Sequence, residues 1–274
     1  MTIHCIDKIA LIAGSGSLPR QVYDACVLHG IECEVIGLDA STSEELFHDV
    51  KHSVYQPHAV SKIINKIRLL GIKHVVFAGK VNRQNISKLL LDSKGAKLFA
   101  MILRKGLNDN SVLQTIIKFF EHEGFIVLAP EQIATEIVVS RGNITKVDID
   151  KEAKDDIYKG FNILKGIAHF DVGQAIVIQN GLVLGVEAAE GTDDLIKRSG
   201  EIQQKNEKGA ILIKACKPEQ DRRIDLPCIG KHTIQYLADA GLRGVALEAG
   251  TSLILNPQET IESANEKGIF IYGI

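Results

Sequence analysis

The sequence has 274 residues, of which 45% are hydrophobic and 24% are charged, and its formal net charge is −2. These values are typical of a protein with a substantial buried core and enough chain for two domains. The small negative charge and the absence of a Lys/Arg-rich run argue against a nucleic-acid-binding protein, so we expect no nucleic-acid partner.

The cysteines and the apolar runs indicate a cytoplasmic protein. The five cysteines are odd in number and form no CxxC pair, which favours reduced, structural thiols over zinc ligands. The first residues lack the pattern of a secretory signal. No stretch approaches the roughly 20 apolar residues of a membrane span.

Short apolar runs alternate with helical patterns through the first half of the chain. We predict strands over residues 9–13, 34–38, 74–78 and 125–129, and helices over 19–29, 59–70, 87–103 and 111–123. This alternation is typical of a parallel sheet covered by helices on both faces. We place this α/β domain at residues 1–131, followed by a connecting segment over 132–149.

A second α/β domain is expected over residues 150–274. Its clearest feature is Asn180-Gly181 between two apolar runs, which predicts a β-hairpin. Helices are expected over 149–169, from Thr192, over 231–240 and from Pro257, with apolar strand-like runs over 209–213, 245–247, 252–255 and 269–272.

Two loops of the first domain could contact a nucleotide. In Gly14-Ser15-Gly16-Ser17-Leu18-Pro19, the glycines could let the backbone approach a phosphate at a helix N-terminus. Proline stands where a dinucleotide motif has its third glycine, and a tight strand–helix turn explains the pattern equally well. Lys80 follows a predicted strand, where it could neutralise phosphate or simply lie in solvent.

The hairpin is followed by a turn that contains four carboxylates, those of Glu187, Glu190, Asp193 and Asp194. Carboxylate oxygens are the ligands that Mg²⁺ prefers, usually one or two of them with substrate phosphates. Helix capping and a solvated acidic turn account for the same spacing, and spacing alone favours them.

The most unusual stretch is KACKPEQDRRIDLPCIG, residues 214–230, which follows a buried apolar run. Lys217, Arg222 and Arg223 could hold phosphate oxygens. Asp225 lies between apolar neighbours, where a carboxylate is costly unless it is paired or bound to metal, and where it could orient a water. A structural Asp–Arg pair is an equally good reading of these residues.

One histidine pair has metal-ligand spacing. His48 and His52 could grip zinc on a helix, but the HExxH glutamate is missing, and a solvated helix end is the better interpretation.

Taken in order, several motifs resemble one family. They are LIAGSGSLP, FAGKVNR, DVGQAIVIQNGLVLGVEAAEGTD, KACKPEQDRRIDLPCIG and GLRGVALEAGTSLIL. Over essentially the whole chain the sequence resembles the LpxI family of UDP-2,3-diacylglucosamine pyrophosphatases, which act in lipid A biosynthesis.

The resemblance implies a hydrolase in which water attacks the α-phosphorus of UDP-2,3-diacylglucosamine. The products would be UMP and 2,3-diacylglucosamine 1-phosphate (lipid X), and the cofactor would be Mg²⁺. It also implies a Rossmann-like N-terminal domain, a C-terminal α/β domain specific to the family, and a homodimer. The expected location is the cytoplasm, with peripheral contact at the inner face of the inner membrane.

The family motif R-x-D-L-P carries one functional role onto this chain, that of Asp225 as the catalytic and metal-binding residue. Chemistry and position suggest the remaining site residues. The predicted metal ligands are Asp225, Glu187, Glu190 and Asp193. The predicted substrate contacts are Gly14, Gly16, Ser17, Lys80, Asn82, Gln174, Thr192, Lys217, Gln220 and Arg223.

The chain departs from the family pattern in two places. Relatives carry Gly-Asp-Asp where this chain has Asn108-Asp109-Asn110, which puts in doubt a role for two acids there. Relatives also tend to have Leu-Pro-Arg-Gly where residues 139–142 read Val-Ser-Arg-Gly.

Two other functions fit parts of the sequence. A non-catalytic sugar-nucleotide or lipid carrier would bind the same ligand without turnover. A nucleotide-dependent oxidoreductase is suggested by Gly14-Ser15-Gly16 alone, and it would not depend on Asp225.

Overall fold

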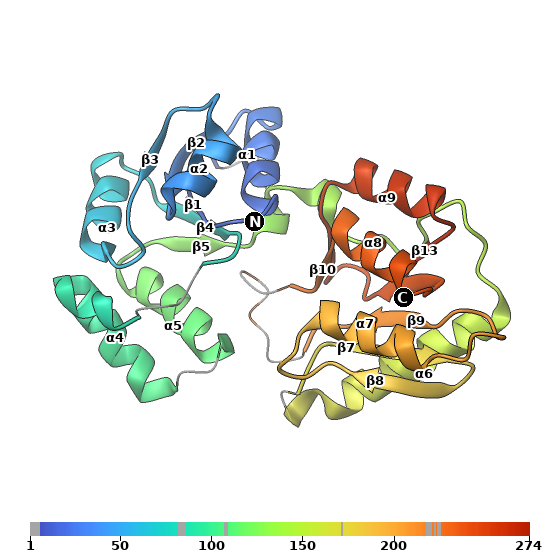
Figure 1. Cartoon of the computed structure of the whole chain (residues 1–274). Coiled ribbons are helices and arrows are strands. Elements are labelled where there is room, and N and C mark those ends of the chain that lie inside the picture. The colour runs from blue at the N-terminus through green and yellow to red at the C-terminus, as the bar shows by residue number, and fades with distance from the viewer. Residues whose placement is uncertain are drawn as a thin grey trace. The chain divides into compact units, whose positions relative to one another are not determined.

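The computed structural model describes residues 6–81, 86–106, 109–170, 172–217, 221, 223 and 226–274. The chain forms two compact units, each with its own sheet (Figure 1). The first unit extends to Thr135 and also includes Asp221 and Arg223, and the rest of the chain from Glu136 forms the second unit.

The first unit is built on a five-stranded sheet in the order β3-β2-β1-β4-β5, in which every pair is parallel. Its central strands β1 and β4 are apolar and largely buried, as expected of a parallel sheet with both faces covered, whereas the edge strand β3 is not buried. They are β1 Lys8–Ala13, β2 Glu32–Gly37, β3 His52–Val54, β4 His74–Ala78 and β5 Ile126–Leu128.

Helices cover both faces of this sheet. The helices α3, α4 and α5 share one apolar cluster with alternate strand residues such as Ile12 and Val75. By contrast, α1 contacts β1, β2 and β4, and α2 contacts β2 and β3. The bounds are α1 Leu18–Leu28, α2 Ala40–Phe47, α3 Val60–Leu69, α4 Ser93–Lys105 and α5 Asp109–His122, with short 3₁₀ turns η2 Ile86–Leu91, η3 Pro130–Gln132 and η4 Thr135–Ile137.

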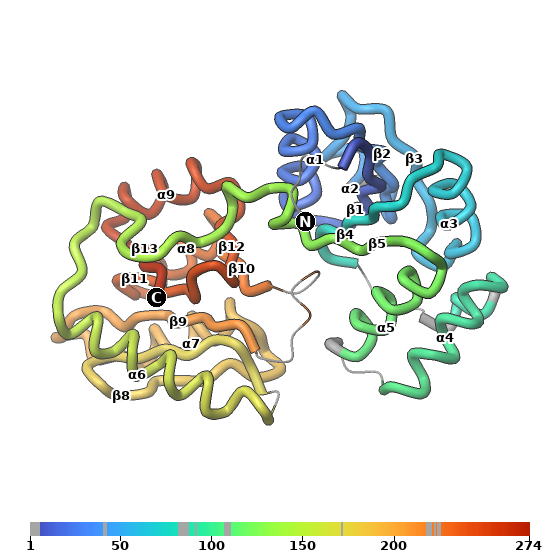
Figure 2. Tube along the Cα trace, turned by 180° about the vertical axis from the view of Figure 1, so that it is seen from behind, coloured from blue at the N-terminus to red at the C-terminus, as the bar shows by residue number. Residues whose placement is uncertain are grey.

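The second unit contains a six-stranded sheet in the order β6-β13-β11-β9-β7-β8. The strands β13, β11 and β9 are parallel, while β6, β7 and β8 pair with antiparallel neighbours. The bounds are β6 Gly142–Asn143, β7 Ala175–Gln179, β8 Leu182–Val186, β9 Ile211–Lys214, β11 Gly244–Leu247 and β13 Phe270–Gly273. Two shorter strands, β10 Cys228–Ile229 and β12 Leu253–Ile254, pair beside it (Figure 2).

The alternation of side chains in this sheet separates two cores. Ile176, Ile211 and Ile213 face the long helix α6, Lys151–Ile167, which is followed by the 3₁₀ turn η5 Ala168–Phe170. Val177 and Leu212 face the opposite cluster, which includes residues of α7 Thr192–Ile202, α8 Lys231–Asp239 and α9 Pro257–Glu266. In the described part of the chain, none of the helices is long and apolar enough to cross a bilayer.

The predicted parallel sheet and the β7–β8 hairpin are confirmed. Asn180 and Gly181 both have positive φ, 48° and 76°, as a two-residue hairpin turn of type I′ requires. The sequence prediction missed α2 and β3. His48 lies just past the end of α2 and His52 begins β3, so the two histidines do not share a helix face.

The predicted connection over 132–149 contributes to the second sheet. Its residues Gly142 and Asn143 form β6, which pairs with β13 at the sheet edge. The apolar pieces on either side of Arg141-Gly142 therefore belong to the second unit, whose boundary lies between Thr135 and Glu136.

Asp150 fastens three parts of the second unit at the end of the sheet from which β9 and β11 start. Its carboxylate accepts a hydrogen bond from the Ala153 amide at the start of α6 (2.7 Å), from Lys208 before β9 (2.9 Å) and from Arg243 before β11 (2.8 Å). Burial works to raise the pKa of Asp150, but these donors outweigh it and lower the pKa to about 2.

This network predicts a specific acid sensitivity. A carboxyl group with a depressed pKa adds stability above its unfolded pKa of about 4, and that stability is lost as the pH falls toward 2. Asp150→Asn keeps a residue that caps helices but removes the charge. The difference in unfolding free energy between wild type and variant, measured in urea, should shrink between pH 4 and pH 2. A difference that stays constant with pH would contradict this account.

Candidate active site

In the first unit, the Gly14–Pro19 turn is joined directly to the end of β4. The Gly14 amide donates to Ala78 O (2.8 Å), the Ser15 amide donates to Lys80 O (2.8 Å), and the Lys80 amide donates back to Ser15 O (2.9 Å). This is the switch point of the sheet, where open α/β folds bind ligands. Two of the amides that could have held a phosphate are therefore used by the neighbouring strand.

Gly14 of this turn has a steric function. A Cβ atom on Gly14 would lie 2.3 Å from the carbonyl oxygen of Lys80, so only glycine allows the two strand ends to approach. Gly16 and Ser17 lie beyond the bonded pair at the start of α1, and the side chain of Lys80 is exposed. These three residues remain predicted nucleotide contacts, while Asn82 lies outside the described residues.

In the second unit, polar and charged side chains gather at the carboxyl ends of β9 and β11. Lys214 ends β9 opposite Leu247, and Glu248 follows β11 directly. The antiparallel strands β7 and β8 bring Gln174 and Glu187 to the same edge, since Ala175 is opposite Lys214 and the Glu187 amide donates to Ala175 O.

A buried chain of hydrogen bonds connects three of these positions. Glu187 is only 7% exposed, and its carboxylate accepts from the Gln174 amide (2.9 Å) and the Thr192 hydroxyl (2.6 Å). Lys214, 5% exposed, donates from Nζ to Thr192 Oγ1 (3.1 Å) and to the Cys228 carbonyl (3.2 Å). Lys214 forms no ion pair with any carboxylate of the described residues, so it is a buried cation bonded to neutral oxygens.

A second group lies beside it, at the end of β11. Lys165 of α6 donates to both carboxylate oxygens of Glu248 (2.8 Å each) and to the Cys216 carbonyl (2.9 Å). The Cys216 amide donates back to Glu248 (2.9 Å). The chain that leaves β9 is thereby fixed in position as far as Cys216.

These contacts hold both ends of the Lys214–Gly230 segment at the sheet edge. Lys214 bonds the Cys228 carbonyl, and the Pro227 carbonyl accepts from the Leu253 amide (2.9 Å). Between these ends, Lys217 is half-buried, and Gln220 and Asp225 lie outside the described residues. The sheet edge thus supports the base of the segment that contains the predicted catalytic aspartate.

Arg223 is fully engaged by carboxylates. It donates from Nε (2.9 Å) and Nη2 (2.8 Å) to Asp221, and from Nη1 to Glu121 of α5 (2.5 Å), all within the first unit. Burial tends to raise the pKa of Asp221, but the Arg223 guanidinium holds it below its usual value. The predicted phosphate contact by Arg223 would require it to exchange at least one of these partners.

The predicted acidic metal ligands also have protein partners. Both oxygens of Glu187 accept hydrogen bonds, and Glu190 accepts from Arg198 Nη2 (2.8 Å) and from the Ala188 amide (3.1 Å). Asp193 is exposed in the first turn of α7. Among the described residues, no three carboxylate, imidazole or thiol groups gather as a metal site requires.

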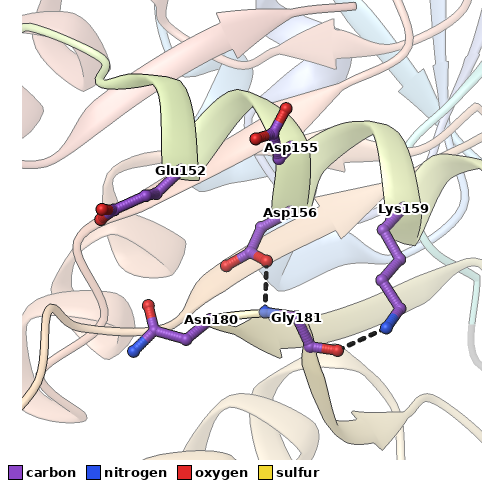
Figure 3. Close-up of a pocket in the computed structure, with 6 residues that line it drawn as sticks. All are labelled: Glu152, Asp155, Asp156, Lys159, Asn180 and Gly181. Carbon is purple, nitrogen blue, oxygen red and sulfur yellow. Dashed lines mark hydrogen bonds between the residues drawn. The ribbon is translucent and has the colours of Figure 1, made fainter.

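A separate hollow of about 400 Å³ lies between α6 and the β7–β8 hairpin turn (Figure 3). It is at the other end of the strands from Lys214 and Glu248. Asp156 accepts from the Gly181 amide (2.6 Å), and Lys159 donates to the Gly181 carbonyl (2.5 Å). None of the predicted site residues lines this hollow, and its hydrogen bonds fasten the turn to the helix.

Three site residues were missed from the sequence: Lys165, Lys214 and Glu248. Lys214 and Glu248 were detectable, because each is a charged residue at the end of a buried parallel strand, where such sheets bind ligands. Lys165 had no such signal, since a lysine on a long helix is usually solvated. Together the three bring two ammonium groups and one carboxylate to the edge, an arrangement suited to holding an anionic group beside a polar one.

Comparison with known families identifies both halves of the chain. Residues 8–137 match the LpxI N-terminal domain and residues 140–272 match the LpxI C-terminal domain. The chain belongs to the LpxI family. The predicted family and the predicted fold class, a parallel-sheet domain followed by a second α/β domain, are thereby confirmed.

A curated relative from Caulobacter vibrioides is 34% identical over 279 residues, covering 97% of each chain, and is named UDP-2,3-diacylglucosamine pyrophosphatase LpxI. Among solved structures, the Bordetella bronchiseptica enzyme WbmG in complex with NAD and UDP is 15% identical, over 44% of this chain and 36% of its own, with a TM-score of 0.29. The Thermotoga maritima UDP-glucose 4-epimerase is 14% identical, over 52% and 41%, with a TM-score of 0.25. Scores this low carry no argument about this chain.

The close approach of Gly14 to Lys80 gives a first prediction. Gly14→Ala should lower the unfolding free energy by about 2–3 kcal/mol, because the new methyl group overpacks a rigid backbone contact. Ser15→Ala removes only a half-exposed hydroxyl bond to Lys80 O, so it should cost less than about 1 kcal/mol. Urea unfolding of both variants measures this, and equal effects would contradict the steric account.

The Thr192 hydroxyl gives a second prediction. Thr192→Val keeps the shape of the side chain but breaks the link between Glu187 and Lys214, and should cost about 1.5–3 kcal/mol of unfolding free energy. Thr251→Val is a matched control, because within the described residues its hydroxyl makes one long bond of 3.4 Å. If the two variants lose the same unfolding free energy, the bonds from Thr192 to Glu187 and Lys214 do not stabilise the protein more than an ordinary surface bond, and the prediction is wrong.

Proposed function

We propose that this protein hydrolyses UDP-2,3-diacylglucosamine to UMP and 2,3-diacylglucosamine 1-phosphate, a reaction of lipid A biosynthesis. The observation that carries the proposal is the match along 97% of both chains to a relative named for this activity. The matched C-terminal domain, residues 140–272, contains the whole Lys214–Gly230 segment and the sheet edge that supports it.

The chemistry of the sheet edge supports a diphosphate substrate. A diphosphate is doubly anionic, and its hydrolysis adds negative charge in the transition state that nearby cations stabilise. Lys214 supplies a buried ammonium group with no carboxylate paired to it among the described residues, and Lys217 follows it by three positions. The buried position strengthens this effect, because water screens the charge less there.

The nucleophile in the proposed reaction is water. Its oxygen attacks the α-phosphorus, the bond from that phosphorus to the bridging oxygen breaks, and 2,3-diacylglucosamine 1-phosphate leaves. Asp225 is the proposed residue that orients the water and accepts its proton. Lys214 bonds the Cys228 carbonyl, so the two ends of the segment that contains Asp225 in the sequence are joined.

The described carboxylates do not fit a magnesium site by themselves. Glu187 and Glu190 use their oxygens for protein donors, and three ligating groups gather nowhere in the described part of the chain. Dependence on Mg²⁺ is therefore a proposal that rests on Asp225 and on oxygens of the substrate, which is how this ion is commonly held.

The family suggests two further properties, which we include in the proposal. The protein would form a homodimer, and it would work in the cytoplasm at the inner face of the inner membrane, where a substrate with two acyl chains resides. Burial of those chains contributes about 0.8 kcal/mol per CH₂ group, which favours an enzyme that stays close to the bilayer.

The two rival functions make different demands on the chain. An NAD-dependent oxidoreductase would need the β1–α1 turn for a pyrophosphate, but the Gly14 and Ser15 amides donate to the carbonyl oxygens of Ala78 and Lys80 instead. A carrier would bind the substrate without needing Asp225 for any reaction.

Turnover of UDP-2,3-diacylglucosamine by the purified full-length protein tests the proposal. UMP should form with Mg²⁺ and not with EDTA, and in ¹⁸O-labelled water the label should appear in UMP. Asp225→Asn should lower the rate at least about 100-fold, as loss of a general base does. Asp239→Asn is the control, because it makes the same change in an exposed residue of α8 that bonds only Gln235 among the described residues.

The outcomes separate the alternatives. Tight binding without turnover would favour the carrier. If the ¹⁸O label appears in 2,3-diacylglucosamine 1-phosphate, water attacks the β-phosphorus and not the α-phosphorus. An unaffected Asp225→Asn variant would remove the proposed role of that residue, and no binding at all would limit the resemblance to the fold.

A further inference from the structure

The exposed side of α4 combines uncompensated positive charge with exposed leucines. Residues 88–105 contain five basic residues and a single acidic one, Asp92. Lys97, Arg104 and Lys105 are exposed on α4, and Leu103 beside them is 55% exposed. The preceding turn adds Leu90, which is 56% exposed.

The acids near this surface are already occupied. Asp92 caps α4 through the Gly95 amide and accepts from Ser61, and Glu123 pairs with Lys94 and with Arg68. Within the described residues, Lys97, Arg104 and Lys105 take part in no ion pair, whereas many other surface lysines do. An ordinary solvated helix would offset such charges with acids one turn away, and α4 contains none.

A neighbouring helix adds to the positive charge. Lys118 of α5 lies against Lys105, and its side chain lowers the pKa of Lys105. The ammonium groups of Lys105 and Lys118 repel each other, and an anion bound between them would offset this repulsion.

The leucines are not required by the core. The opposite face of α4 buries Leu98 and Ile102, which are 4% and 1% exposed, in the apolar cluster of the first unit. Leu103 is therefore held outward while its neighbours fill the core. The exposed side of α4 presents basic residues and Leu103, and the preceding turn presents Leu90. Basic residues together with exposed apolar ones are typical of surfaces that lie in a membrane interface.

We propose that this surface, formed by Leu90, Lys97, Leu103, Arg104, Lys105 and Lys118, docks the protein on an anionic phospholipid bilayer. The inference rests on the proposed function in one respect, since a substrate with two acyl chains is delivered by a membrane. The lysines and the arginine bind phosphate headgroups, and the two leucines enter the boundary between headgroups and acyl chains.

Vesicle binding of the full-length protein tests the surface without any need for turnover. The protein should co-sediment with vesicles of phosphatidylcholine and phosphatidylglycerol, but not with phosphatidylcholine alone, and high salt should weaken the binding. Changing Lys97, Arg104 and Lys105 together to Gln should reduce vesicle affinity on the order of 100-fold, from about fivefold per basic residue.

The matched control changes three other exposed lysines, Lys154, Lys197 and Lys267, to Gln. They also form no ion pair within the described residues and give the same change in net charge. This control should bind like wild type. An equal loss in both triple variants would mean that net charge alone governs binding, and would overturn the proposal.

Tryptophan fluorescence tests the position of Leu103, because the chain has no tryptophan of its own. Leu103→Trp should shift its emission to the blue on anionic vesicles. Leu182→Trp, at a site that is 54% exposed in the second unit, should not shift. No shift at Leu103, or retention on polyglutamate without any vesicle binding, would overturn the proposal, the latter in favour of an acidic protein partner.

Discussion

The buried ammonium group of Lys214 is the feature on which the candidate site depends. A charge removed from water is tolerated only when other groups replace its hydration. Here the Thr192 hydroxyl and the Cys228 carbonyl do so, which fixes the end of β9, the start of α7 and the return of the Lys214–Gly230 segment. Glu187 then balances the charge indirectly, through the same hydroxyl group.

The two sheets use their carboxyl edges in opposite ways. In the first unit, backbone bonds join the Gly14 turn to Ala78 and Lys80, so the Gly14 and Ser15 amides at this edge already have acceptors. In the second unit, the strand ends carry side chains instead, and Lys165, Lys214 and Glu248 reach the edge from three elements. The second unit therefore provides most of the side-chain contacts described for the candidate site.

Sequence patterns located most of the elements because their signals are local. The Asn180-Gly181 turn and the alternation of strands with helices each depend on neighbouring residues. The elements α2 and β3 escaped because they are short and their apolar spacing is weak. The hydrogen-bonded chain through Glu187 could not be predicted, because its members are brought together only by the pairing of β7 with β8 and β9. The sequence also suggested metal ligation by that carboxylate, without showing that its oxygens already have protein partners.

The basic side chains of this protein differ in whether a polar partner is fixed against them. Where a lysine is buried or half-buried, as at Lys214 and Lys165, a hydroxyl, carbonyl or carboxylate group is fixed against it. On α4, Lys97 and Lys105 lack such partners among the described residues, although Lys94 of the same helix is paired with Glu123. Folding stability does not require an unpaired basic surface with outward leucines, and like charges at this spacing oppose it. Such a surface is consistent with an anionic partner that the isolated chain does not supply.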